Sequence, residues 1–301
     1  MFAGAAFTDQ ADIKVKDEVV DTLVELGVIE GFEDGSFQPN ATVTRAQMAK
    51  MIYVLRTGNS DASAYNDDKT SFTDIGSHWA RGYIKYCQSL GIIAGKSNTI
   101  FAPNASVTAQ EAAKMLLVTL GYDANKAGLV GAGWAAKTNA LADENGLLED
   151  VNTSFTGPCP RQYAAQILYN ALDMERVVWS NDIEDFKPAT DVDDDKTIGG
   201  KYMDLVKTDA AQLLSVEKTS GKDTYEITLG KAVKYGDGDH TKAKFDKVPT
   251  DVADMIGLNV KVLVKAKANG DTNVYGVYAD DDSKVLATGT VGTLDTVKNE
   301  S

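Results

Sequence analysis

The chain is poor in the residues from which metal sites and nucleophilic catalytic centres are usually built. Its 301 residues include two histidines and two cysteines. No pair of them has the spacing of a zinc site, and neither a phosphate-binding glycine loop nor a nucleophile elbow is present. Cys87 and Cys159 lack the cysteine framework of a disulfide-stapled domain, so a bridge between them is the less favoured alternative. The sequence predicts no resident cofactor and no catalytic residues.

Long apolar runs and an excess of positive charge are also missing. No stretch approaches the 18 or so apolar residues that span a bilayer. The net charge of −14 disfavours nucleic acid as a partner, while 43% hydrophobic and 25% charged residues are typical of a folded protein. We interpret residues 1–6 as the remnant of a cleaved signal peptide or as an added start, which favours a secreted protein.

A repeat with a period of 64 residues is the main feature that is present. The segment LGVIEGFEDGSFQPNATVTR (26–45) recurs as LGIIAGKSNTIFAPNASVT (90–108), and a shorter third copy covers 145–172. Repeats of this length form units that bury their apolar faces against one another. Three such copies favour a module for attachment over an enzyme.

Each copy reads as a helix, a glycine-containing loop and a second helix. The second helix of the first two copies begins with a capping box, from Thr44 to Gln47 and from Thr108 to Glu111. The third begins at Pro160, a residue that the first turn of a helix tolerates. The pattern therefore predicts three equivalent helix starts.

Two of these three helix starts carry an arginine. Arg45 and Arg161 fall in register, and Ala109 occupies the same place in the second copy. The backbone N–H groups of an open helix start and a guanidinium together can hold an anion. Local salt bridges at the helix start are the alternative interpretation.

The segment FTDIGSHWA (72–80), the loop ending in FAPN and the TRAQ helix start resemble the S-layer homology domain. Three tandem copies of that domain anchor bacterial proteins to cell-wall polymers. The resemblance implies an all-α-rich pseudo-trimer, with a central three-helix bundle, prongs and ligand grooves between the repeats. In Gram-positive relatives the ligand is a secondary cell-wall polysaccharide that often bears pyruvate ketals, which would suit an anion site.

The resemblance also implies a set of ligand-binding residues. The Arg, Asp, Trp and Gly of the family motif match Arg45, Arg161, Asp9, Asp74, Trp79, Trp134, Gly31 and Gly95. The first repeat has Lys14-Val15 in place of the tryptophan, and the third has no clear Phe-x-Asp before its tryptophan. These departures predict unequal grooves. The two tryptophans are equally compatible with a role as core aromatics that hold prong to bundle.

The composition changes after the third repeat. We predict residues 1–6 as a remnant, repeats at 7–58, 59–121 and 122–176, an acidic linker at 177–197, a small β-rich domain (barrel or sandwich) at 198–288, and the start of a further, truncated segment at 289–301. Alternating runs such as 260–264 predict the strands, and dense carboxylates predict an extended, solvated linker.

One acidic cluster raises the question of calcium. Asp191, Asp193 and Asp195 have the spacing of the first three ligands of a calcium loop. Lys196 and Tyr202 stand where that loop needs Gly and Glu, so the helix-loop-helix site fails. A looser Ca²⁺ site, here or at 237–239, is the less favoured alternative to a solvated linker.

Together these features predict a non-catalytic cell-wall anchoring module of a secreted surface-layer-type protein. Its expected partners are a secondary cell-wall polysaccharide and copies of itself in a surface layer. The alternative is a wall-tethered enzyme whose C-terminal part acts on polysaccharide.

Overall fold

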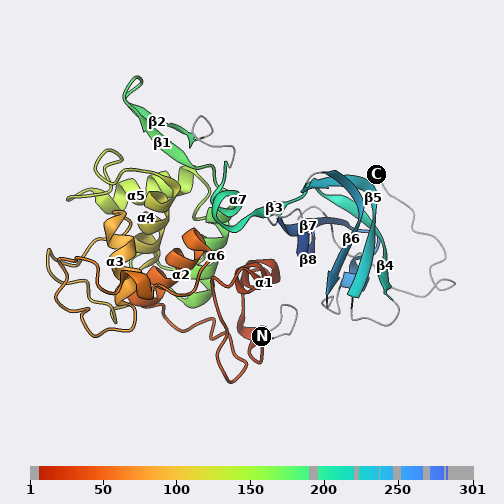
Figure 1. Cartoon of the computed structure of the whole chain (residues 1–301), viewed down its shortest axis with the longest axis horizontal. Coiled ribbons are helices and arrows are strands. Elements are labelled where there is room, and N and C mark those ends of the chain that lie inside the picture. Colours follow the sequence, from red (N-terminus) through yellow and green to blue (C-terminus); the bar gives the residue numbers. More distant parts are fainter. Residues whose placement is uncertain are drawn as a thin grey trace. The chain divides into compact units, whose positions relative to one another are not determined.

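The computed structural model describes residues 7–189, 196–219, 224–236, 238–246, 252–266, 272–280 and 283. The chain divides into two compact units, Met1–Val206 (unit 1) and Lys207–Ser301 (unit 2). Unit 1 carries the α-helices and unit 2 is built from strands (Figure 1). The prediction of an α-rich N-terminal part followed by a β-rich part is therefore confirmed.

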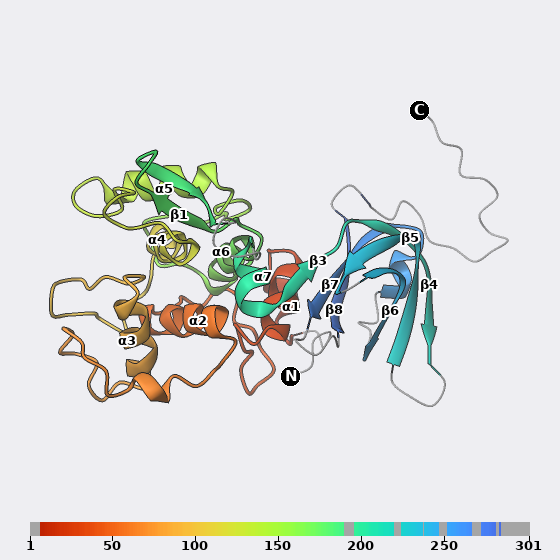
Figure 2. The same cartoon turned by 45° about the horizontal axis from the view of Figure 1, so that its top comes forward.

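Unit 1 alternates short outer helices with longer, more deeply buried ones. Its elements are η1 (Gln10–Asp12), α1 (Asp17–Glu25), α2 (Arg45–Thr57), η2 (Ser63–Tyr65), α3 (Arg81–Ser89), α4 (Ala109–Leu120), α5 (Trp134–Glu144), α6 (Arg161–Leu172) and α7 (Ile198–Met203). Helix α3 packs against α2, α5 packs against α4, and α1 packs against α6 (Figure 2). The first helix of each repeat thus lies on the second helix of another repeat.

The capping boxes form as the sequence predicts. The Thr44 Oγ1 accepts from the Gln47 N–H at 3.2 Å, and the Gln47 side chain accepts from the Thr44 N–H at 2.8 Å. Thr108 and Glu111 make the same pair of bonds at 3.2 and 3.1 Å. Helix α6 begins after Pro160 without a side-chain cap, so its first donors need partners elsewhere.

A ring of backbone hydrogen bonds joins the three segments that precede α2, α4 and α6. The Val43 N–H donates to the Cys159 carbonyl at 3.1 Å, Cys159 to Val107 at 2.8 Å, and Val107 to Val43 at 2.9 Å. All three residues are buried. Each copy therefore satisfies backbone donors of its neighbour, which explains why a single copy is not a closed structure.

The stretch expected to be an acidic linker is folded where it is described. Strands β1 (Val177–Ser180) and β2 (Asp185–Pro188) form an antiparallel hairpin in which Trp179 lies opposite Phe186. The Phe186 ring lies 4.8 Å from that of Tyr122 in the third repeat, and α7 packs against α2. The linker prediction is thus wrong for residues 177–189, because aromatic packing outweighs repulsion among the turn carboxylates.

Unit 2 is a six-stranded, curled antiparallel sheet. Its elements are β3 (Leu205–Lys207), β4 (Ala211–Lys218), β5 (Thr224–Tyr235), β6 (Gly238–Asp246), η4 (Val252–Met255), β7 (Asn259–Ala266) and β8 (Thr272–Ala279). The strand order is β3-β7-β4-β5-β6, with β8 on the other edge of β7, and β6 also lies against β8. Alternate residues such as Ile227, Val260 and Val262 point into its core.

Candidate functional site

A cavity of about 310 Å³ in unit 1 is lined by residues from all three repeats. We call it the Arg45 groove. Its lining includes Arg45 at the start of α2, Gly95 and Lys96 in the loop after α3, Glu111 and Lys114 on α4, and Trp134 at the start of α5. Among the eight residues that the resemblance implied, Arg45, Gly95 and Trp134 are thus brought together. The repeats meet here because the outer helix of one copy lies on the inner helix of another.

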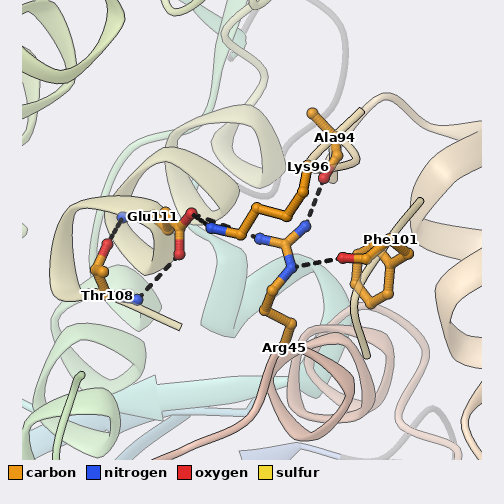
Figure 3. Close-up of polar contacts among 6 residues, drawn as sticks. All are labelled: Arg45, Ala94, Lys96, Phe101, Thr108 and Glu111. Atoms are coloured by element: carbon orange, nitrogen blue, oxygen red, sulfur yellow. Dashed lines mark hydrogen bonds and ion pairs between the residues drawn. The ribbon is translucent and has the colours of Figure 1, made fainter. Parts of the chain in front are cut away.

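Arg45 forms the floor of the groove and is held by backbone carbonyls. Its Nε donates to the Phe101 carbonyl at 2.9 Å and its Nη2 to the Ala94 carbonyl at 2.6 Å (Figure 3). The guanidinium lies 4.5 Å from the centre of the Phe101 ring, and the side chain is 3% exposed. Burial lowers the pKa of the Arg45 guanidinium below its usual value, and the charges of Glu111 and Asp74 oppose this shift.

Lysines and one carboxylate line the walls. The Lys96 Nζ donates to the Glu111 Oε1, which is also 3.7 Å from the Arg45 Nη1 (Figure 3). Lys114 lies with its Nζ 5.3 Å from the centre of the Trp134 ring. Burial lowers the pKa of Lys114, with Arg45 adding to the shift and Glu111 opposing it. The groove therefore presents three cations, one carboxylate and an indole.

Arg161 has an equivalent setting at the start of α6. Its Nη2 donates to the Glu30 carbonyl, and the guanidinium lies 5.0 and 5.1 Å from the centres of the Phe32 and Phe37 rings. Burial lowers the pKa of Arg161 to about 10, and the Glu30 charge opposes it. Lys50 pairs with the Glu30 carboxylate at 3.3 Å. We call these five residues the Arg161 site.

The helix starts are not open to an anion in the way the sequence suggested. The Arg45 N–H donates to the Ala105 carbonyl at 2.9 Å, and the Arg161 N–H to the Ala41 carbonyl at 2.8 Å. The next amide donors, at Ala46 and at residue 162, bond the carbonyls of Pro103 and of residue 39. Anion binding therefore depends on side-chain cations, because neighbouring repeats occupy these backbone donors.

The two motif aspartates hold loops together. Both Asp74 carboxylate oxygens accept backbone N–H bonds, from Phe101 at 3.0 Å and from Ala102 at 2.7 Å. Asp9 does the same for Phe37 and residue 38, at 2.8 Å each. Ala102 has a φ of 59°, a left-handed conformation that these bonds support. The aspartates therefore position the ring that lies against each arginine.

The remaining motif residues differ in their surroundings. Gly31 lies between the two loop residues that contact Arg161. A Cβ on Gly95 would come within 2.2 Å of the Ser97 carbonyl oxygen, so this glycine permits a tight loop. Trp79 is 57% exposed and its ring lies 6.1 Å from that of Tyr83. It is therefore a surface aromatic rather than a core residue.

Lys96, Glu111 and Lys114 are groove residues that the sequence reasoning did not assign. The sequence indicates Glu111 only as part of a capping box, and it does not single out Lys114. Their alignment beside Arg45 depends on contacts between repeats. The one local signal was the charge of Glu111 and Lys114 in the first turns of α4, and Lys96 in the preceding loop had none.

The other candidate chemistry is limited. Cys87 and Cys159 are buried free thiols. Within the described ranges, no group of three or more His, Cys, Asp or Glu side chains is placed to hold a metal ion. Asp191, Asp193 and Asp195 lie outside the described residues, so the calcium alternative stays a prediction. In the part of the chain that the structure covers, no helix combines the length and apolar character needed to cross a membrane.

Comparison with known proteins identifies the class. A family model of the S-layer homology domain matches residues 6–49 and 71–113. A cell surface protein of Thermoanaerobacter kivui is 26% identical over 310 residues, which cover 95% of this chain and 38% of that protein. A surface layer protein of Brevibacillus choshinensis is 29% identical over 174 residues, or 56% of this chain and 15% of that protein.

A cellulosome-anchoring protein of Acetivibrio thermocellus is 31% identical over 94 residues, 31% of this chain and 21% of that protein. The chain thus spans well under two thirds of the length of each of these relatives. The chain carries S-layer homology domains, matched at 6–49 and 71–113. It is a secreted, cell-wall-associated surface protein.

Proposed function

We propose that unit 1 anchors the protein by binding an anionic secondary cell-wall polysaccharide in grooves between its repeats. The observation that carries the proposal is the Arg45 groove, which gathers three cations and an indole in a chain of net charge −14. A carboxylate on a sugar finds charged partners in Arg45 and Lys114, and the sugar ring has a stacking surface in Trp134. A pyruvate ketal is such a group, so a pyruvylated polymer is the proposed ligand.

The proposal includes a pseudo-trimer in which α2, α4 and α6 form the central bundle. The ring of hydrogen bonds through Val43, Val107 and Cys159 supports this arrangement, as does the repeated packing of outer on inner helices. The grooves are unequal in it. Arg45 and Arg161 supply a guanidinium to two of them, whereas Ala109 leaves the third without one.

The proposed module is non-catalytic. Relatives named as surface layer and cellulosome-anchoring proteins support an anchoring role. The proposal extends to assembly with copies of the same chain in a surface layer. Electron microscopy of the purified protein on wall fragments tests this extension, because assembly produces a regular lattice and simple anchoring produces a disordered coat.

Sedimentation with purified cell walls tests the anchoring function. The full chain and the fragment 1–204 should sediment with walls, whereas the fragment 205–301, which keeps β3 whole, should stay in the supernatant. Walls stripped of their polysaccharide should retain none of them. Retention of the fragment 205–301 alone, or equal retention by stripped walls, would contradict the proposal.

Two variants assign the binding to the Arg45 groove. Lys114→Met removes a charge but keeps most of the apolar stem, and Trp134→Ala removes the stacking surface. Each should weaken wall binding by about tenfold, the effect of losing one charge-assisted contact or one stacked ring. Lys234→Met, at an exposed position of β5, is the matched control. If both groove variants bind as tightly as the parent, the polymer binds elsewhere.

A further inference from the structure

The Arg45 groove contains a carboxylate of its own. Glu111 uses its Oε2 to accept from the Thr108 N–H at 3.1 Å, and its Oε1 contacts Lys96 and lies 3.7 Å from the Arg45 Nη1 (Figure 3). Its side chain is 15% exposed. The capping bond fixes the carboxylate in place, so a ligand that enters the groove meets this charge in a defined position.

The cap itself does not require this charge. Gln47 is the third residue of α2, as Glu111 is the third residue of α4, and its amide closes the same capping box. Gln47 and Glu111 are nearly equal in size. An amide thus serves the helix start equally well in the same chain, and what the carboxylate adds at 111 is negative charge beside the groove cations.

We propose that Glu111 is a specificity-determining residue of the Arg45 groove, selecting a hydroxylated sugar with a single acidic group over a compact polyanion. This inference rests on the proposed function of the groove. The carboxylate repels additional negative charge and accepts hydrogen bonds from sugar hydroxyl groups. Arg45 and Lys114 balance one acidic group of the ligand, and a second acidic group would approach Glu111. A sugar with one carboxylate satisfies all these groups at once.

Affinity for two probes tests the proposal with the full chain. One probe is a monosaccharide bearing a pyruvate ketal, and the other is inorganic tripolyphosphate. Titration calorimetry at low salt should show that Glu111→Gln strengthens tripolyphosphate binding by about three- to tenfold. The acidic sugar should gain less, because it loses a charged hydroxyl acceptor. The ratio of sugar to tripolyphosphate affinity should therefore fall, and the fall should become smaller as salt rises.

Two further variants separate the charge effect from general effects. Glu217→Gln, at an exposed position of β4 in unit 2, makes the same change in net charge and should leave the ratio unchanged. Lys96→Gln removes a partner of Glu111 and should shift the ratio in the opposite direction, toward the sugar. It also covers the case in which Glu111→Gln does not fold. The melting temperature of every variant is measured first.

The outcomes are distinguishable. If the parent chain does not bind the acidic sugar, the proposed function of the groove fails, whatever the variants do. If the parent binds it and Trp134→Ala removes the binding, but Glu111→Gln and Lys96→Gln leave the ratio as in the parent, the specificity role of Glu111 is overturned. A ratio that also changes in Glu217→Gln overturns it as well, since net charge alone would then account for the effect.

Discussion

Replacing Arg45 by alanine should destabilise unit 1 even when no ligand is present. The guanidinium donates to two carbonyls, those of Phe101 and Ala94, and lies over the Phe101 ring. The substitution removes all three contacts and leaves two carbonyls without their donor. Because the Arg45 side chain is only 3% exposed, water replaces these contacts poorly.

The magnitude follows from the number of contacts. A hydrogen bond from a charged donor contributes about 1.5–3 kcal/mol, and a cation–π contact about 1 kcal/mol. The cost of burying the charge, which lowers the pKa of Arg45, offsets part of this. We expect a net loss of about 2–4 kcal/mol. Arg161→Ala should lose less, about 1–2 kcal/mol, because the Arg161 Nε has no hydrogen-bond partner among the described residues.

Urea denaturation followed by circular dichroism at 222 nm measures this loss. The signal reports on unit 1, because all α-helices of the described residues lie there. The comparison uses linear extrapolation, provided that the slopes of the variants agree. A loss below about 1 kcal/mol for Arg45→Ala, or a larger loss for Arg161→Ala, would refute the reasoning from carbonyl contacts. The two arginines would then contribute to ligand binding and not to the stability of unit 1.

Three further predictions concern stability and reactivity. Gly121→Ala should destabilise the β1–β2 hairpin by about 1–3 kcal/mol and alter tryptophan fluorescence. Gly121 has a φ of +117°, and a Cβ there would lie 1.9 Å from the Val177 carbonyl oxygen of the hairpin. Gly133→Ala, with open space around the new methyl group, is the control. Burial raises the pKa of the Asp74 carboxyl, but hydrogen bonds from two backbone amides outweigh it and lower the pKa below its usual value. Stability should therefore fall as pH drops below about 4, and the melting temperature should depend less on pH in Asp74→Asn. Burial raises the thiol pKa of Cys87 and Cys159 to about 12; both should resist a thiol reagent at pH 8 until urea unfolds unit 1, and reaction in the native state would contradict this.

Local sequence signals predicted the helix starts well. Thr44 and Thr108 each stand three residues before a glutamine or glutamate, and both capping boxes form as expected. Such signals are reliable because the bonds that they predict close within one turn. The change from helical to alternating patterns also predicted a helical unit followed by a unit of strands. The predicted boundary was too early in the chain, because the hairpin and α7 belong to unit 1.

Contacts between distant segments could not be predicted in the same way. The carboxylates at 181–196 indicated a solvated linker, yet the rings of Trp179 and Phe186 meet edge to face at 5.1 Å across a hairpin of residues 177–188. Likewise, the sequence predicted free backbone N–H groups at the helix starts, but carbonyls of other repeats accept hydrogen bonds from them. Repulsion among exposed charges is weak, so a few aromatic contacts decide the outcome.

The sequence by itself determined that this protein is built from repeats, where the inner helices begin, and which two copies carry an arginine. Its periodicity and capping residues act over a few positions and need no tertiary partner. Only the tertiary structure decided which residues share a groove. Arg45, Glu111 and Trp134 come from three different repeats and meet because each outer helix packs on the inner helix of another copy. Backbone hydrogen bonds between repeats set that packing, and their partners, such as Val43 and Cys159, lie far apart in the chain.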